Sequence, residues 1–258
     1  MKTVTTIAEL RQFLAPARVG TIGLVPTMGA IHAGHLALFD RARAECDTVV
    51  ATVFVNPAQF GDAADLADYP RNLESDARAA EHAGVDVVFA PTQQELYPPG
   101  FATWVEPEGA ALGLEGEARP GHFRGVATVC LKLFTIVRPD VAYFGRKDAQ
   151  QVAVVKQLVR DLNLELELRV VPTVRDPDGL ALSSRNRQLS AEERRRAVAI
   201  PRALETGNPA RARAVLAEAG IEPEYVAVAN LDGPTLAVAA RVGSTRLIDN
   251  VQLEGEKL

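Results

Sequence analysis

The chain of 258 residues has little cysteine and no long uninterrupted apolar segment. Its two cysteines, Cys46 and Cys130, form no C-x-x-C pattern. This excludes a disulfide framework and indicates two small buried side chains in a reducing compartment. Glycine, proline or Lys132 interrupts the longest apolar stretches, so none of them can span a bilayer.

The sequence also lacks an excess of positive charge. Its net charge is −5 and its pI about 5.5, whereas broad nucleic-acid binding needs a basic surface that displaces counterions. The N-terminal segment does not read as a signal peptide, because Lys2, Glu9 and Arg11 interrupt its apolar residues. We therefore expect a cytoplasmic protein that binds neither membranes nor nucleic acid, with a sizeable core.

Histidine is scarce as well, and two of the four histidines lie together in the segment PTMGAIHAGH, residues 26–35. An apolar run at residues 21–25 precedes this segment, and apolar residues at helical spacing follow it at 36–39. The pattern predicts a strand, a glycine-rich turn and the first turn of a helix.

A helix start of this kind can bind phosphate, because its unpaired backbone N–H groups carry partial positive charge. The same field disfavours protonation of His32 and His35, so both are expected to be neutral hydrogen-bond donors. Gly34 leaves room for a base or a ribose against the backbone. We interpret the segment as a nucleotide site. The alternatives are a metal-binding pair and two ordinary surface histidines, but no H-E-x-x-H glutamate or third ligand is nearby.

Strand-like and helix-like segments alternate through the first two thirds of the chain. The strands are apolar on both faces, which predicts an α/β fold with a doubly wound, Rossmann-like parallel sheet covered by helices. Ligands of such sheets bind at the carboxyl ends of the strands, and motifs follow Val25, Val55, Phe144 and Val174. The expected strands are residues 21–27, 48–56, 85–91, 141–145 and 166–174, and the expected helices are residues 32–46, 73–83, 122–138 and 148–162.

The character of the sequence changes near Arg175. Ser190 and Glu193 form a capping box that predicts an arginine-rich helix through about residue 205, with the arginines at 194–196 on a solvated face. A turn cluster and a short helix at residues 209–219 come next. The strand-like runs at residues 224–230, 235–242 and 246–253 then predict an antiparallel sheet.

We therefore expect two domains. Residues 1–174 form the nucleotide-binding domain, and residues 175–258 form a smaller C-terminal α+β domain. The second domain is expected to act as a lid.

Polar side chains follow two of the expected strands. Asn56 and Gln59 offer neutral amides that suit the hydroxyls and carboxylate of a small polar substrate, although a structural turn is an equally good interpretation. Lys147 can place positive charge on phosphate oxygens, while Asp148 can cap a helix or accept from ribose hydroxyls. Gln151 lies one turn further on and faces the same way as Asp148.

A turn-rich segment that we expect to be mobile carries Ser183, Ser184 and Arg185. Two hydroxyls beside an arginine suit a polyphosphate, and a mobile segment could close them over it.

Seven segments occur along the chain in this order: PTMGAIHAGH, FVNPAQFG, YPRN, RPGHFRGVATV, YFGRKDAQQ, DGLALSSRN and GSTRLIDN. Through them, most of the chain resembles the pantoate–β-alanine ligase (pantothenate synthetase) family, part of the H-x-G-H nucleotidyl-transferase group. The resemblance implies a doubly wound nucleotide-binding domain. It also implies ATP-dependent joining of pantoate to β-alanine through pantoyl adenylate, with release of pyrophosphate and AMP.

The resemblance also implies roles at the ATP. His35, together with His32, would stabilise the α-phosphate or donate a proton, and Lys147 with Arg185 would neutralise the departing pyrophosphate. Gly145 and Asp148 would hold the ribose, and the backbone at Val174 would meet the adenine. The full set expected at ATP is Met28, Gly29, His32, Gly34, His35, Gly145, Arg146, Lys147, Asp148, Val174, Leu182, Ser183, Ser184 and Arg185.

For the other two substrates the resemblance points to amides. Gln59 and Gln151 would grip pantoate from opposite sides, with Asn56 beside them, and Gln59 would also border the β-alanine site. His122 and Arg124 in RPGHFRG either shape the pantoate pocket or have a structural role.

Magnesium is expected to bridge the phosphates mainly through water. Asp76 is the candidate carboxylate for it, although a solvated helix start would explain this residue equally well. The family also suggests a homodimer formed through the larger domain.

The chain departs from the family pattern in places. Arg146 replaces the acidic residue usual in G-E-K-D, Ala149 replaces a common aromatic residue, and the segment between about residues 205 and 224 is shorter than typical. Arg146 is expected beside ATP, but neither replaced position is assigned a catalytic step.

Three other functions agree less well with the sequence. A nucleotidyl transferase with a phosphorylated acceptor would need further basic residues rather than the pair Gln59 and Gln151. An aminoacyl-tRNA synthetase-like fragment disagrees with the acidic balance and the missing anticodon-binding domain. An inactive binding protein disagrees with the presence of all the phosphate-facing residues.

Overall fold

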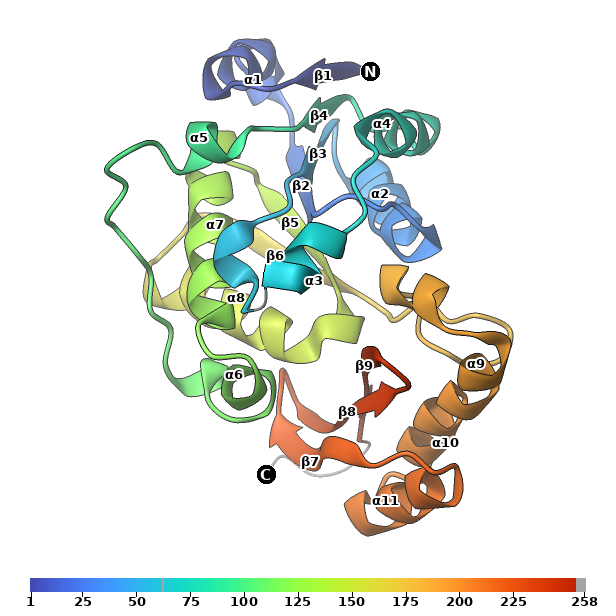
Figure 1. Ribbon diagram of the computed structural model, residues 1–258. Helices are drawn as coiled ribbons and strands as arrows, with labels where there is room; N and C mark the ends of the chain where they lie inside the picture. The colour runs from blue at the N-terminus through green and yellow to red at the C-terminus, as the bar shows by residue number, and fades with distance from the viewer. Residues whose placement is uncertain (62, 254–258) are drawn as a thin grey trace. The chain divides into compact units, whose positions relative to one another are not determined.

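The computed structural model describes residues 1–61 and 63–253 (Figure 1). The chain forms two compact units, each described here by itself. The first comprises Met1–Phe144 with Val154–Val171, and the second comprises Gly145–Ala153 with Pro172–Leu258. The division predicted between residues 174 and 175 stays a prediction. The observed grouping places the segment around Lys147 with the C-terminal part of the chain.

The predicted doubly wound sheet is confirmed. Its six strands lie in the order β1-β4-β3-β2-β5-β6, and the pairs β1–β4, β4–β3, β3–β2 and β2–β5 are parallel. The direction of the strand order reverses beside β2, which is the switch point at which such sheets bind ligands. The strands are β1 (Lys2–Val4), β2 (Ile22–Thr27), β3 (Thr48–Val53), β4 (Val87–Phe89), β5 (Val141–Gly145) and β6 (Glu167–Val171).

Helices cover both faces of this sheet, with α2 and α4 on one side and α7 on the other (Figure 1). The four predicted helices are found within one residue of their expected ends, whereas four of the five predicted strands are shorter than expected. The strand expected at residues 48–56 ends at Val53, since Asn56 begins a 3-10 turn. The helices are α1 (Ile7–Leu14), α2 (Ala33–Glu45), α3 (Ala63–Asp68), α4 (Leu73–His82), α5 (Gln93–Leu96), α6 (Leu114–Ala118), α7 (His122–Val137) and α8 (Ala149–Asp161), with 3-10 turns η1 (Pro16–Val19), η2 (Pro57–Gln59) and η3 (Gly109–Ala111).

Two faces of the sheet are buried by different helices. Side chains of α2 and α4, such as Phe39 and Ala80, pack on strand residues that include Val25 and Val49. On α7 most residues are buried, as its apolar sequence predicts. The helix ends at Arg138, which has a φ of 49°.

The buried thiol of Cys130 on α7 makes the free energy of unfolding depend on pH in the alkaline range. Burial raises its pKa to about 12, whereas a thiol of the unfolded chain ionises with a pKa of about 8.5. Between these values the unfolded chain has lost the proton and the folded chain retains it. The free energy of unfolding should therefore fall as pH rises, by up to about 1.4 kcal/mol per pH unit for this group.

Denaturant titrations between about pH 9 and pH 12 measure this effect. Cys130→Ala should decline less steeply than the wild type, because its unfolded chain has no thiol to ionise at this position. Val129→Ala is the matched control, since it truncates the same buried helix and keeps the thiol. A Cys130→Ala slope equal to that of the wild type would contradict the argument.

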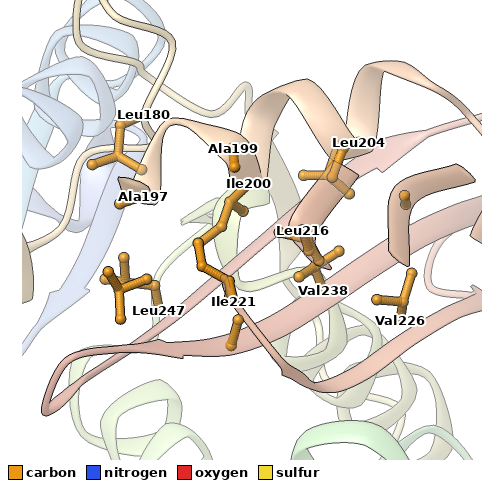
Figure 2. Close-up of a cluster of buried hydrophobic side chains, with 14 of the residues drawn as sticks. Leu180, Ala197, Ala199, Ile200, Leu204, Leu216, Ile221, Val226, Val238 and Leu247 are labelled. Atoms are coloured by element: carbon orange, nitrogen blue, oxygen red, sulfur yellow. The ribbon is translucent and has the colours of Figure 1, made fainter. Parts of the chain in front are cut away.

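The second unit contains the predicted antiparallel sheet, in the order β7-β8-β9. Alternate residues of β8, such as Leu236 and Val238, pack with helix residues such as Ile200 and Leu216 in one apolar core (Figure 2). The expected α+β architecture is confirmed. The elements are η4 (Arg146–Asp148), η5 (Ser184–Gln188), α9 (Ala191–Ala197), α10 (Ala199–Glu205), α11 (Pro209–Glu218), β7 (Pro223–Asn230), β8 (Pro234–Val242) and β9 (Thr245–Gln252).

The prediction of one arginine-rich helix through residue 205 is wrong, because two helices meet at Val198. Pro201 gives the physical reason. It has no N–H to donate to the carbonyl of Ala197, and its ring crowds that carbonyl. The capping box that starts α9 is confirmed, with Ser190 and Glu193 bonded to each other's backbone.

The arginines of α9 are less solvated than expected. Arg194 lies 2.6 Å from a carboxylate oxygen of Asp176 and 2.9 Å from one of Asp178. Arg196 donates to the carbonyls of Ala219 and Gly220. Two of the three arginines therefore tie α9 to neighbouring turns.

Among the helices of residues 1–61 and 63–253, none combines the length and the apolar character that crossing a membrane requires.

Candidate active site

The turn between β2 and α2 is held from inside the first unit by Asp76. This carboxylate on α4 is 4 % exposed. Its Oδ2 accepts the Ala30 N–H at 3.0 Å and its Oδ1 accepts the Ile31 N–H at 2.8 Å. Gly29 has a φ of 84°, and a Cβ there would lie 2.6 Å from Asp76 Oδ2. The turn can therefore close on the carboxylate only with glycine at this position.

The interpretation of Asp76 as a solvated helix start is therefore wrong. Sequence reasoning missed its contact with the turn, since 45 or more residues separate the partners. As a magnesium ligand it stays a prediction.

His32 and His35 cap the first turn of α2 reciprocally. Nδ1 of His32 accepts the Gly34 N–H at 3.1 Å, and Nδ1 of His35 accepts the His32 N–H at 3.3 Å. The ring centroids are 4.1 Å apart. A neutral imidazole that accepts at Nδ1 carries its proton at Nε2. Both rings are thus set to donate from Nε2.

This geometry changes how a phosphate would be bound. The N–H groups of Ala30, Ile31 and Gly34 donate to Asp76 or to His32, and the His35 N–H donates to the His32 carbonyl at 2.8 Å. The prediction that the backbone N–H groups of this helix start are unpaired is therefore wrong for these four groups, and the phosphate site itself stays a prediction. The imidazole Nε2 atoms are the donors that the turn presents.

A chain of hydrogen bonds orients Gln59. Burial raises the pKa of Tyr97 to about 12, so its hydroxyl keeps its proton and donates to Asn56 Oδ1 at 3.0 Å. Asn56 Nδ2 must then donate, and it does so to Gln59 Oε1 at 3.0 Å and to the Gly125 carbonyl at 3.1 Å. The Gln59 amide consequently points its NH₂ group the other way, 3.2 Å from Met28 Sδ.

Asn56 has no hydrogen-bonding position left for a substrate. Its Oδ1 accepts from Tyr97 and from the Ala58 N–H, and both Nδ2 protons are donated within the protein. It is also 1 % exposed. The structure therefore gives Asn56 the task of orienting Gln59 in place of the predicted contact with pantoate.

The backbone of Gln59 is fixed by the start of α7. His122 Nδ1 lies 2.9 Å from the Gln59 carbonyl. A Cβ on Gly125 would lie 2.3 Å from the Ala58 carbonyl oxygen, so α7 reaches η2 only through a glycine. Of the two interpretations of His122, this contact with the Gln59 backbone supports the structural role.

Aromatic side chains surround Tyr97. Its ring stacks on that of Trp104, with 5.9 Å between centroids, and meets Phe101 edge-on at 5.1 Å. The Arg124 guanidinium lies 4.2 Å from the centre of the Trp104 ring. Arg124 therefore supports this cluster. No sequence motif marks Tyr97 or Trp104, so the sequence pattern does not predict this cluster.

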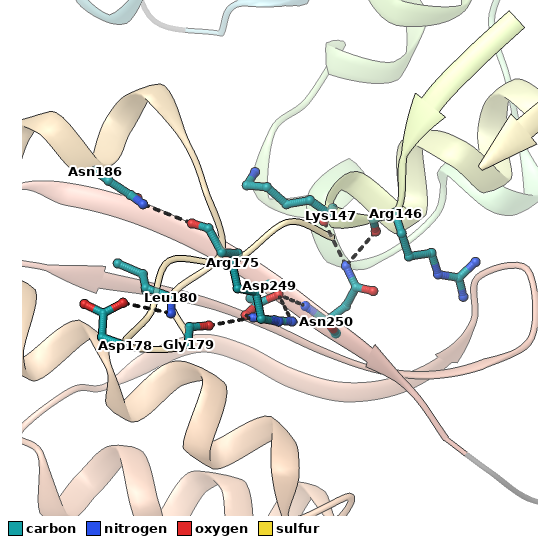
Figure 3. A network of polar contacts seen from close by, with 10 residues as sticks. Arg146, Lys147, Arg175, Asp178, Gly179, Leu180, Asn186, Asp249 and Asn250 are labelled. Carbon is teal, nitrogen blue, oxygen red and sulfur yellow. Dashed lines mark hydrogen bonds and ion pairs between the residues drawn. The ribbon is translucent and has the colours of Figure 1, made fainter. Parts of the chain in front are cut away.

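In the second unit, the segment Gly145–Asp148 lies on the three-stranded sheet (Figure 3). Lys147 Nζ is 3.3 Å from Asp148 Oδ1. The Arg146 guanidinium binds Asp232 at 3.1 Å and Thr235 Oγ1 at 3.2 Å. Burial lowers the pKa of Arg146, and the charge of Asp232 opposes that effect. Because its side chain is engaged with β7–β8, Arg146 could contribute to ATP binding only through its backbone.

The turn-rich segment that carries Ser183 and Arg185 forms a hydrogen-bonded hairpin, and its mobility stays a prediction. The Leu182 N–H donates to the Val174 carbonyl at 3.0 Å, and Arg175 pairs with Ala181 as an isolated bridge. Ser183 caps η5 by accepting the Arg185 N–H at 3.3 Å. The predicted residues Val174, Leu182, Ser183, Ser184 and Arg185 are thus brought together in one substructure. Gln151 lies on the first turn of α8, with a half-buried side chain.

Metal ligands are not grouped in the part of the chain that the structure describes. No cluster of three or more His, Cys, Asp or Glu side chains suitable for a metal ion occurs within residues 1–61 and 63–253. Both cysteines are buried and unpaired.

Comparison with known proteins identifies relatives along nearly the whole chain. The sequence model of the pantoate-beta-alanine ligase family matches residues 2–252. The pantothenate synthetase of Chloroflexus aurantiacus is 51 % identical over an alignment 281 positions long, gaps included, which covers 99 % of each chain. That of Moorella thermoacetica is 49 % identical and covers 98 % of this chain and 99 % of its own.

Solved structures agree. The crystal structure of pantothenate synthetase from Thermus thermophilus has a TM-score of 0.91 at 47 % identity and covers 98 % of this chain and 99 % of its own. The pantoate-beta-alanine ligase from Francisella tularensis, complexed with beta-gamma ATP and beta-alanine, has a TM-score of 0.90 at 37 % identity. It covers 98 % of this chain and 97 % of its own. Because the family model matches nearly the whole chain and these relatives share about half of its residues and its fold, the chain belongs to the pantoate–β-alanine ligase family.

Proposed function

We propose that the chain makes pantothenate from pantoate, β-alanine and ATP in two half-reactions. A carboxylate oxygen of pantoate attacks the α-phosphorus of ATP, the bond from that phosphorus to the bridging oxygen breaks, and pyrophosphate leaves. The amine of β-alanine then attacks the acyl carbon of pantoyl adenylate and displaces AMP. Both steps depend on positioning and on stabilising charge, so a covalent nucleophile of the protein is not needed.

The observation that carries the proposal is the reciprocal cap of His32 and His35. It sets two Nε2 donors on the turn after β2, where the N–H groups of Ala30, Ile31, His32 and Gly34 donate within the protein. We assign His35 to the α-phosphate, with His32 beside it, and Met28, Gly29 and Gly34 to the surrounding ATP surface.

Lys147 and Arg185 supply the positive charge for the departing pyrophosphate in this proposal, together with the hydroxyls of Ser183 and Ser184. Gly145 and Asp148 hold the ribose. The backbone of Val174 and Leu182 meets the adenine, and Arg146 takes part through its backbone alone.

Pantoate is held between the amides of Gln59 and Gln151, and Gln59 also borders the bound β-alanine. The NH₂ group of Gln59 is the donor, since Asn56 occupies its Oε1. A hydroxyl or a carboxylate oxygen of pantoate can accept from that group.

Removing the hydroxyl of Tyr97 tests the proposed orientation of the Gln59 amide. In Tyr97→Phe, Asn56 Oδ1 loses its buried donor, so the Gln59 amide is less strictly oriented and the KM for pantoate should rise roughly fivefold to tenfold, about 1 to 1.4 kcal/mol. The KM for ATP should stay near that of the wild type. Tyr225→Phe, in the three-stranded sheet, is the matched control. Equal changes in the KM for ATP and for pantoate would contradict the orienting role.

Magnesium is proposed to arrive with ATP. The described residues contain no group of three or more acidic, histidine or cysteine ligands, which suits an ion held by phosphate oxygens and water rather than a resident metal. Asp76 remains the candidate carboxylate, although both of its oxygens accept backbone N–H groups.

We also propose a homodimer formed through the first unit and a cytoplasmic location. The resemblance to the family supports the dimer. Two unpaired, buried cysteines support a reducing compartment.

The test is exchange of labelled pyrophosphate into ATP without β-alanine. We expect exchange only when pantoate is present, because reversal of the first half-reaction needs pantoyl adenylate. Formation of ADP and orthophosphate during pantothenate synthesis would instead indicate an acyl phosphate and would overturn the proposal.

A further inference from the structure

Two adjacent polar residues of β9, Asp249 and Asn250, bind other segments of the second unit through hydrogen bonds (Figure 3). Asn250 is 6 % exposed and Asp249 is 3 % exposed. Adjacent residues of a strand point to opposite faces of the sheet. Asp249 therefore lies on the face of Leu247, which belongs to the apolar core beneath the helices, and Asn250 lies on the opposite face.

Asn250 donates both protons of one amide to two consecutive backbone carbonyls. Its Nδ2 is 3.0 Å from the Arg146 oxygen and 2.8 Å from the Lys147 oxygen. The first carbonyl belongs to the peptide that precedes the Lys147 Cα, and the second to the peptide that follows it. Because peptide groups are planar, fixing both of them fixes φ and ψ of Lys147 and the direction of its Cα–Cβ bond.

The orientation of the Asn250 amide is unambiguous. Both of its partners are carbonyls, which only accept, so the NH₂ group must face them. Its Oδ1 has no hydrogen-bond partner among residues 1–61 and 63–253. Burying an acceptor oxygen without a donor costs free energy. The two hydrogen bonds from Nδ2 to the Lys147 segment offset that cost.

Asp249 holds the neighbouring hairpin in the same way. Its carboxylate accepts two bonds from the Arg175 guanidinium, at 2.6 and 3.1 Å. The same guanidinium donates to the Gly179 carbonyl at 3.0 Å. This pair ties β9 to the hairpin that carries Ser183 and Arg185.

We propose that Asn250 is a positioning residue of the first half-reaction, which directs the Lys147 ammonium by clamping the two peptides on either side of it. Asp249, through Arg175, holds the Ser183–Arg185 segment to the same strand, so that β9 supports both groups of phosphate-binding residues. The inference rests on the proposed function of Lys147, and Asn250 touches no substrate in it.

Steady-state pyrophosphate exchange on the full chain tests the clamp. Asn250→Ala should lower kcat/KM for ATP by about 10- to 100-fold, because two hydrogen bonds to the Lys147 segment are lost. The KM for pantoate should change less than about twofold. Asn208→Ala is the matched control, since it removes the cap of α11 in the same unit and should lower stability without lowering kcat/KM for ATP.

A double-mutant cycle distinguishes the role of Asn250 in holding the Lys147 segment from the proposed role of Lys147 itself. If Asn250 acts through Lys147, Asn250→Ala should cost less than about threefold in a Lys147→Ala background. Full additivity of the two effects overturns the inference. A Lys147→Ala variant with wild-type kinetics overturns the proposed function of Lys147, whatever Asn250 does.

A second variant and a second measurement test the proposal if Asn250→Ala does not fold. Asn250→Ser leaves a small polar residue that is too short to reach both carbonyls, and amide hydrogen exchange can be followed by mass spectrometry. We expect faster exchange in peptides from residues 145–153, with Asn208→Ala unchanged there. Wild-type exchange in that segment would overturn the clamp independently of any activity.

Discussion

Replacing His35 with alanine is expected to lower the rate of pyrophosphate exchange by about 10²- to 10³-fold, the usual cost of one preorganised donor to a charge that develops in the transition state. His35 accepts the His32 N–H at Nδ1, so the neutral ring donates from Nε2. The α-phosphate gains a fifth substituent as pantoate attacks, and this donor is already in place. The fall should be in kcat more than in the KM for ATP.

Two substitutions separate catalysis from capping at His35. Asparagine can still accept the His32 N–H through Oδ1 but offers no donor at the reach of Nε2. His35→Asn should therefore unfold near the wild-type temperature and be about as slow as His35→Ala. His35→Gln, which has an N–H donor at comparable reach, should recover part of the rate.

His82→Ala is the matched control for His35. His82 lies exposed on α4, where its Nδ1 contacts the Arg78 carbonyl, so the variant should exchange pyrophosphate at the wild-type rate. A His35→Asn enzyme with normal turnover would remove the ring from the mechanism.

Loss of the Lys147 charge is expected to be comparably severe. Pyrophosphate gains negative charge as its bond to the α-phosphorus breaks, and a nearby ammonium stabilises that charge. Lys147→Met keeps the length of the side chain without the charge, so we expect about 10²- to 10³-fold slower exchange. Lys147→Arg keeps the charge in a different shape and should lose less.

The measurement for Lys147 is single-turnover formation of pyrophosphate with saturating ATP and pantoate. Lys156→Ala, which removes a lysine from the following helix α8, should behave as the wild type. Normal ATP affinity together with a normal rate in Lys147→Met would show that the charge acts elsewhere.

Local signals predicted the elements that carry the site. The apolar run before Pro26 and the helical spacing after His35 predicted β2 and α2 closely. The capping box at Ser190 predicted the start of α9. The end of that helix is also predictable from the sequence, because Pro201 lies where a helix interior is expected and proline breaks a helix there.

Contacts between distant residues could not be predicted in this way. Asp76 meets the Ala30 N–H across 46 positions, Tyr97 meets Asn56 across 41, and Asn250 meets the Lys147 carbonyl across 103. Each depends on how strands and helices pack, which periodicity does not encode. For this reason the sequence pattern predicts neither the acceptors of the backbone N–H groups after β2 nor the buried hydrogen-bond partners of Asn56.

The ion pair between Arg146 and Asp232 has a consequence for exchanging residues between members of the family. Where the family pattern has an acidic residue, this chain has an arginine whose guanidinium lies 3.1 Å from the Asp232 carboxylate. Grafting glutamate there alone would set two anions against each other in a half-buried spot. A graft at position 146 therefore has to be made as a swap with position 232.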